Sequence, residues 1–194
     1  RVTLDLVDTP INEAFNLVAS IKDHINTNIA NYVIMMSLHA NDINYMKWLV
    51  SVVREKSIKL DSSSARCIAA CVNSHTATDI RELLDEELLT NIKEVFVLRQ
   101  LCLYFEKKEI DKDTLIRCGD DISDDMLAYA AYILANVNEP QRAFDILSGK
   151  VDKDKLTIRL RLFMQVMSRL PEQQPELYEL LKKHRKSGLP IDEG

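Results

Sequence analysis

The segment SIKLDSSSAR (residues 57–66) separates two apolar runs and decides how the chain is interpreted. The run before it covers residues 43–56 and the run after it residues 64–73, and both have the apolar spacing of helices. The segment itself is polar, as expected of a loop between two helices. The question is whether this loop is one joint in a chain of repeated units.

The same helical spacing continues along the rest of the chain. Only 4 glycines and 5 prolines occur in 194 residues, and no alternating runs of β-branched residues are bounded by turn dipeptides, so strands are not expected. Asp42, Asp79, Asp113 and Ser123 lie at first-turn positions, and Pro140 and Pro175 suit helix starts. An all-α fold is therefore predicted, with helices at 12–24, 28–39, 43–56, 64–73, 80–88, 92–107, 114–118, 124–137, 141–147, 156–170 and 176–186.

These helices form pairs that recur at a regular distance. The tetrad beginning at Asn31 aligns with the one beginning at Arg66, 35 residues later, and short polar runs precede both. The end of the chain, SGLPID (187–192), aligns with the joint KSIKLD (56–61), and the interval holds four helix pairs. The pattern predicts one α-solenoid over 1–194, with about five stacked antiparallel hairpins. Its approximate repeats are 10–26 (second helix only), 27–61, 62–90, 91–122, 123–152 and 153–192.

This pattern resembles the pentatricopeptide repeat family, whose unit is a hairpin of about 35 residues. Residues 27–61 have the length and order of one unit, with Asn31 in the opening of the first helix. INEAFNL (11–17) and PQRAFDIL (140–147) are similar to the core of the second helix. Ala30 stands where the family has an aromatic residue, and residues 89–152 follow the period only loosely. The degenerate, acidic repeats are most similar to the leucine-rich mitochondrial type.

The resemblance implies a non-catalytic segment that binds single-stranded RNA in the stability, processing or translation of organellar messenger RNA. In such proteins a base is read at the helix opening and at the closing joint of each repeat. Carried over, the reader pair is Asn31 with Asp61, a combination similar to the family's uracil-preferring pair, and Arg66 would contact phosphate. The mitochondrial matrix is the implied compartment, with the cytoplasm as the alternative. Tetratricopeptide repeats are also similar, through residues 130–135 and 143–144, and would imply a scaffold that holds another protein subunit.

Charge is distributed unevenly around a net value of −5. Residues 79–87 carry a local −4, whereas residues 155–187 carry a local +5. Arg159 and Arg161, in the first helix of the last pair, are expected to support RNA binding electrostatically. The basic patch at the end of the last helix suits the helix dipole and solubility, or contact with phosphate or an acidic partner, and it comprises Lys182, Lys183, Arg185 and Lys186.

Composition limits the class of protein. No run of about 18 apolar residues is present, so insertion into a membrane is not expected. Cys67, Cys71, Cys102 and Cys118 are too few and too irregularly spaced for a disulfide framework, and a secreted protein is not expected. The chain begins at Arg1 with no signal peptide, which suggests a fragment whose targeting segment is missing.

Two patterns raise the possibility of a metal site. Cys67, Cys71 and His75 recur every four residues and would share one helix face, with Cys102 or His39 as a fourth zinc ligand. Buried packing explains the cysteines better. The run GDDISDD (119–125) suggests calcium but lacks the order of a calcium loop, and acidic residues in a first helical turn explain it better.

No pattern of a catalytic site is present. The chain has no glycine-rich phosphate loop, no nucleophile elbow and no pair of acids in a plausible cleft, and its 4 histidines are scattered. We therefore expect no enzymatic activity, no cofactor and no small-molecule substrate. Trp48 lies among Met46, Leu49 and Val52 and is expected to pack in the core.

Overall fold

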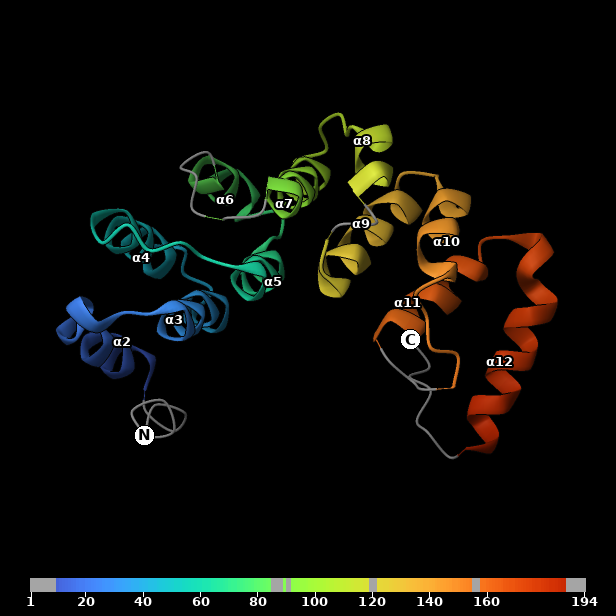
Figure 1. The fold of residues 1–194 in the computed structure, drawn as a ribbon, viewed down its shortest axis with the longest axis horizontal. Helices are drawn as coiled ribbons and strands as arrows, with labels where there is room; N and C mark the ends of the chain where they lie inside the picture. Colours follow the sequence, from blue (N-terminus) through green and yellow to red (C-terminus); the bar gives the residue numbers. More distant parts are fainter. Residues whose placement is uncertain (1–9, 85–88, 90–91, 119–121, 155–157, 188–194) are drawn as a thin grey trace. The chain divides into compact units, whose positions relative to one another are not determined.

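The computed structural model describes residues 10–84, 89, 92–118, 122–154 and 158–187 (Figure 1). Within these ranges every regular element is a helix, and one isolated parallel bridge joins Leu60 to Leu89. The predicted all-α class is confirmed. None of the helices in the described ranges combines the length and the apolar character that crossing a membrane requires.

The chain divides into two compact units, residues 1–111 and 112–194. The division falls inside the predicted repeat 91–122, and the repeat boundaries themselves stay predictions. The helices described in the first unit are α2 (Ile11–Ser20), the 3₁₀-helix η1 (Lys22–His24), α3 (Thr27–Ala40), α4 (Asn44–Glu55), α5 (Ser62–Cys71), α6 (Ala77–Leu84) and α7 (Ile92–Phe105). Those of the second unit are α8 (Lys112–Arg117), α9 (Asp124–Asn136), α10 (Pro140–Ser148), α11 (Ile158–Met167), the 3₁₀-helix η3 (Pro171–Gln173) and α12 (Gln174–Lys186).

In the first unit, helix α3 contacts α2, α4 and α5, and helix α7 contacts α5 and α6. Polar side chains link elements about one predicted repeat apart. The Tyr45 hydroxyl donates to Asn12 over 2.7 Å, across 33 residues. Lys56 donates to Asp23 over 2.6 Å, also across 33 residues, and Lys47 donates to Asp79 over 2.7 Å, across 32. These three contacts therefore share nearly the same sequence separation, whereas the contacts of Thr78 and Arg81 with Glu106 span 28 and 25 residues.

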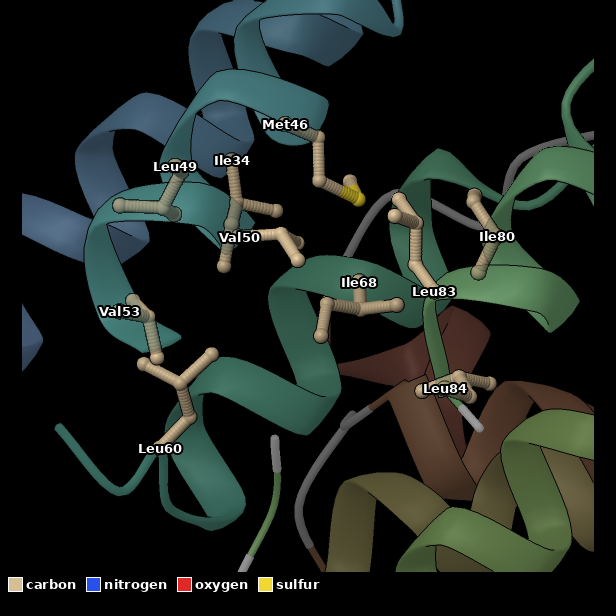
Figure 2. Close-up of a pocket in the computed structure, with 10 residues that line it drawn as sticks. All are labelled: Ile34, Met46, Leu49, Val50, Val53, Leu60, Ile68, Ile80, Leu83 and Leu84. Atoms are coloured by element: carbon tan, nitrogen blue, oxygen red, sulfur yellow. The ribbon is translucent and has the colours of Figure 1, made fainter. Parts of the chain in front are cut away.

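Apolar side chains from these hairpins meet in the interior of the first unit. Figure 2 shows ten of them, contributed by α3, α4, α5, α6 and the joint at Leu60. They leave a cavity of about 10 Å³, which is close to the minimum for one water molecule and has no polar lining to hold one. This space is therefore a gap in core packing and not a ligand site; its lining residues are Ile34, Met46, Leu49, Val50, Val53, Leu60, Ile68, Ile80, Leu83 and Leu84.

In the second unit, α10 contacts α9 and α11, and α11 also contacts α9 and α12. Arg159 of α11 forms an ion pair with Asp124, 35 residues earlier, at the start of α9. Arg169 donates to the carbonyl of Ala135, 34 residues earlier, near the end of α9. The separation of about one predicted repeat therefore recurs within this unit as well.

Four helices end in the same way, with a residue other than glycine in the left-handed region. The φ angles are 49° at Asn41, 54° at Ser57, 57° at Lys107 and 64° at Asn138. In each case the next amide donates to the carbonyl five residues before it, over 2.9–3.0 Å. These bonds, from residues 42, 58, 108 and 139, satisfy carbonyls that a helix end leaves without a partner.

Several helix boundaries differ from those predicted. The first predicted helix, 12–24, is interrupted after Ser20, and η1 follows it. The helix predicted at 80–88 begins earlier, at Ala77, because the carbonyls of Asn73 and Thr76 already accept from Ala77 and Ile80. Residues 85–88 lie outside the described residues. The last helix begins at Gln174 and not at Glu176, after the 3₁₀ turn of η3.

Trp48 packs against another ring, but it is half-buried and does not lie in the fully buried core as predicted. It lies half-buried on α4, with its ring edge-on to Phe15 of α2 at a centroid distance of 4.9 Å. Phe15 also meets Tyr45 edge-on at 4.7 Å, so the three rings join α2 to α4. Such edge-on contacts stabilise the packing of α2 against α4 beyond the contribution of the apolar area that the rings bury.

Candidate functional site

Asn31 and Asp61 belong to one hydrogen-bond network at the start of α5. The side-chain amide of Asn31 donates to the Ser63 hydroxyl over 2.7 Å. That hydroxyl donates in turn to Oδ1 of Asp61 over 2.6 Å. The buried Ser64 hydroxyl donates back to Oδ1 of Asn31 over 2.6 Å. The two predicted reader residues, 30 positions apart in sequence, are thus connected through two serines.

Asp61 also caps α5. Its Oδ1 accepts from the backbone amides of Ser63 (3.0 Å) and Ser64 (3.2 Å), which are otherwise orphan donors of the first turn. The Ser63 hydroxyl and these amides hold the pKa of the Asp61 carboxyl below its usual range. Asp61 is therefore an exposed, ionised group at neutral pH, and none of the described residues donates a hydrogen bond to its Oδ2.

Arg66 lies exposed on α5, in the turn that follows this network. The guanidinium is close enough to the Cys67 thiol to lower its pKa, although burial raises that pKa more. The first unit therefore presents an amide, a carboxylate and a guanidinium from the openings of α3 and α5.

The two arginines predicted to support RNA binding lie on α11 in the second unit. Arg159 pairs with Asp124 and donates to the carbonyl of Lys150 over 3.0 Å. Arg161 is exposed. Part of the positive charge expected at this helix is therefore compensated within the unit.

The basic patch at the end of α12 is divided between internal contacts and solvent. Lys183 pairs with Asp154 and lowers the pKa of that carboxyl. Lys182 lies 3.8 Å from Glu179 and 5.9 Å from the centre of the Tyr178 ring. Arg185 and Lys186 are exposed, and no ion pair forms between either of them and another described residue. All four lie near the helix C-terminus, where positive charge is favourable.

The candidate zinc ligands do not come together, and their predicted shared helix face is wrong. Helix α5 ends at Cys71, so His75 lies in the turn beyond it and is exposed, whereas Cys67 and Cys71 are buried. The Cys71 thiol donates to the carbonyls of Cys67 (3.3 Å) and Ile34 (3.5 Å), and burial raises its pKa to about 12. In the described part of the chain, no three His, Cys, Asp or Glu side chains are arranged to hold a metal ion.

Other candidate ligands also lie in ordinary structural positions. Cys102 is buried on α7, with its pKa raised to about 12 by burial, and His39 is exposed on α3. The acidic run 119–125 lies partly outside the described residues. Asp124 and Asp125, at its described end, form the first turn of α9, which fits the helix-dipole explanation.

Sequence reasoning missed a charged cluster around Glu106, whose side chain is only 7% exposed. Its carboxylate accepts from Lys108 (2.7 Å), Thr78 (2.8 Å) and Arg81 (3.2 Å). These donors, with Lys108 the strongest, lower the pKa of Glu106 to about 2. The three donors come from α6 and from the turn after α7. No short sequence motif indicates that these segments lie next to each other, so the cluster could not be predicted from the sequence.

The chain was also compared with known proteins. No protein-family model matches it, and neither a curated protein nor a solved structure shows a significant match to it.

Proposed function

We propose that this chain is a non-catalytic helical-repeat segment that binds single-stranded RNA, with Asn31 and Asp61 as its reader pair. The observation that carries the proposal is the connection of these two side chains through Ser63 at the openings of α3 and α5. The resemblance to pentatricopeptide repeats supplies the class of ligand, and the separation of 32–33 residues that three contacts of the first unit share supports a repeat architecture. An organellar role, in the mitochondrial matrix, follows from the same resemblance.

The donor and acceptor groups that the network does not use can form hydrogen bonds with the edge of a base. Asn31 uses one of its two N–H donors for Ser63, and Asp61 keeps Oδ2 as an acceptor. An adjacent donor and acceptor complement the O4 and N3–H groups of uracil. Arg66, on the same helix as the cap, supplies a positive charge for phosphate.

The test is fluorescence anisotropy of labelled single-stranded 12-mers of uridine, cytidine or adenosine, titrated with the whole chain. The unsubstituted chain is expected to bind the uridine strand best. Asn31→Ala is expected to reduce that preference by about fivefold, the value of one hydrogen bond. Binding is measured well below the unfolding temperature, because Ser64 loses its partner and stability falls by about 1–3 kcal/mol.

Tyr45→Phe is the matched control. It removes one hydrogen bond between α2 and α4, again across 33 residues, and leaves Asp61 and Ser63 in place. This variant should keep the uridine preference. An unchanged preference in Asn31→Ala would refute the reader assignment, and no rise in the anisotropy of the uridine strand even at low salt would refute RNA binding by this segment.

A protein-binding scaffold of the tetratricopeptide type is the second candidate. It is favoured by the internal pairing of basic side chains with carboxylates, which leaves less positive charge for phosphates. The described pairs include Lys47 with Asp79, Lys112 with Glu139 and Arg142 with Asp113. RNA binding and protein binding differ in their dependence on salt, which is strong for phosphate contacts and weak for apolar interfaces.

A further inference from the structure

A groove with a volume of about 260 Å³ lies in the second unit, between the last turn of α9 and helix α11. It differs from the gap in the first unit, because polar and apolar side chains both line it. The residues that matter for its chemistry are Tyr132, Asn136, Leu162, Gln165, Val166 and Arg169. A space of this size accommodates one side chain together with a short length of backbone.

The apolar part of the lining is built from both helices. Val166 is buried, and Leu162 and Tyr132 are half-buried, so part of each of the latter two remains exposed. Leu162, Val166 and the Tyr132 ring together offer a contact for one aliphatic side chain.

The groove also holds an arginine without a carboxylate partner among the described residues. Arg169 follows the end of α11 and donates to the carbonyl of Ala135 at the end of α9. Arg142, Arg159 and Lys183 of the same unit each pair with a carboxylate, but Arg169 does not. A guanidinium has five N–H donors, so a positioned positive charge with unused donors remains at the groove.

Two side-chain amides complete the lining. Asn136 donates to the carbonyl of Tyr132 over 2.8 Å, which leaves its amide oxygen as an acceptor. The exposed Gln165 side chain forms no hydrogen bond with the residues that the structure describes. An amide side chain both donates and accepts, as a peptide backbone does, so these two groups can bond to an extended chain.

We propose that this groove binds an extended peptide that places an aliphatic side chain next to a carboxylate. The aliphatic group contacts Leu162 and Tyr132, the peptide backbone bonds to Asn136 and Gln165, and the carboxylate pairs with Arg169. A single guanidinium balances one carboxylate, whereas a nucleic-acid strand brings several phosphates that need several cations. The proposal is independent of the RNA site on α3 and α5, because it uses no residue of the first unit.

The test is a titration of the whole ¹⁵N-labelled chain with the blocked tetrapeptide acetyl-Gly-Leu-Asp-Gly-amide, followed by NMR. Saturable shifts are expected for the side-chain amide signals of Asn136 and Gln165, with a dissociation constant in the millimolar range that suits so small a contact. Arg169→Met should weaken binding about threefold, as loss of a partly exposed ion pair predicts. Arg117→Met, the same change at an exposed residue of α8 in the same unit but outside the groove, should leave binding unchanged.

A second peptide keeps the test independent of how Arg169→Met affects folding. Acetyl-Gly-Leu-Asn-Gly-amide lacks only the negative charge, and it should bind the unsubstituted chain about threefold more weakly. Equal affinity for the two peptides would overturn the role of Arg169. The absence of saturable shifts would overturn the peptide site, and shifts of the same amides by uridine monophosphate alone would indicate a nucleotide site instead.

Discussion

At the scale of single residues, Glu106 is a charged group of the first unit held by several partners. Three donors converge on a carboxylate whose side chain is 7% exposed, and they lower its pKa to about 2. The ordinary pKa of the group is 4.5, so the folded state binds this proton less readily than the unfolded state does. The interaction therefore stabilises the fold fully above about pH 4.5 and is lost as the pH falls toward 2.

Glu106→Gln should lower the free energy of unfolding at neutral pH by about 1–3 kcal/mol, because the donors lose a charged acceptor. Urea unfolding followed by circular dichroism measures this loss. The difference from the unsubstituted chain should shrink steadily below about pH 4.5, where Glu106 itself begins to take up a proton in the unfolded state.

Glu109→Gln is the control, because Glu109 is exposed in the turn that also holds Lys108. This variant should have nearly the same free energy of unfolding as the unsubstituted chain, both near pH 3 and at pH 7. A destabilisation by Glu106→Gln that is as large near pH 3 as at pH 7 would contradict the ionic origin of the effect.

The roles of some single residues could be predicted from the sequence, but their hydrogen-bond partners and burial could not. Asn31 and Asp61 were selected by their positions in a repeat, and the structure connects them, yet their connection through Ser63 and Ser64 was not predicted. The direction of a serine hydroxyl depends on which neighbour the packing of two hairpins brings within reach. Likewise, His184 is 2% exposed although it lies in a run of basic residues, because it shares a face of α12 with Leu177 and Leu180.

At the scale of elements, the left-handed residues that end α3, α4, α7 and α9 set the direction of the chain after each of these helices. Asparagine tolerates this conformation better than other residues with a side chain, which suits Asn41 and Asn138. Ser57 and Lys107 have no such advantage, and a left-handed conformation costs an ordinary residue about 1–2 kcal/mol. Two helix ends therefore carry backbone strain that glycine would remove.

Ser57→Gly should raise the free energy of unfolding by about 0.5–1 kcal/mol, since the relief of strain exceeds the entropy that glycine adds to the unfolded chain. Thermal unfolding measures the change as a higher melting temperature. Ser51→Gly, at an exposed position inside α4, is the control and should lower stability, because glycine is a poor helix former. A lower melting temperature for Ser57→Gly would contradict this account of the helix end.

Helix identities were predictable from apolar spacing, but several helix ends were not. The turn between α5 and α6 illustrates the reason. Oδ1 of Asn73 accepts from the amides of His75 and Thr76, and the Thr76 hydroxyl donates to the carbonyl of Cys71. These side-chain bonds compete with continuation of the helix, so α5 stops at Cys71 although the apolar pattern extends further. Because His75 lies in that turn, it does not share a helix face with Cys67 and Cys71, and the three side chains do not form the predicted metal site.

At the scale of the whole molecule, charge limits the way in which RNA could bind. The net charge is −5, and many of the described basic side chains pair with carboxylates of their own unit. Exposed cations without such a pair in the described ranges include Arg185 and Lys186. An RNA strand would therefore meet few uncompensated positive charges, so the salt dependence of RNA binding should correspond to only a few phosphate contacts.

We expect the logarithm of the RNA association constant to fall with the logarithm of salt concentration with a slope of about −2. That value corresponds to about three phosphate contacts on a single strand. Anisotropy titrations between low and physiological salt measure the slope. Arg66→Gln should make it less steep by about 0.7, and the exposed control Lys107→Gln should not change it. A slope near −5 would require internal ion pairs to open when RNA binds.

The repeat architecture was predicted on a period of about 33–35 residues, and some polar contacts in each unit span 32–35 residues, although others span 23–29. The period was visible because stacked hairpins impose similar lengths on each helix pair. How far the stacking continues as one solenoid stays a prediction.

The position of Ser64 has a further consequence for any ligand of Asn31. Ser64 is fully buried, so its hydroxyl cannot exchange Asn31 for water when a ligand approaches. A ligand that took the whole amide of Asn31 would leave that hydroxyl with only a 3.5 Å contact to Asp61. Ligand affinity at α3 and the folding of the first turn of α5 are then thermodynamically linked, and each must alter the other by the same free energy.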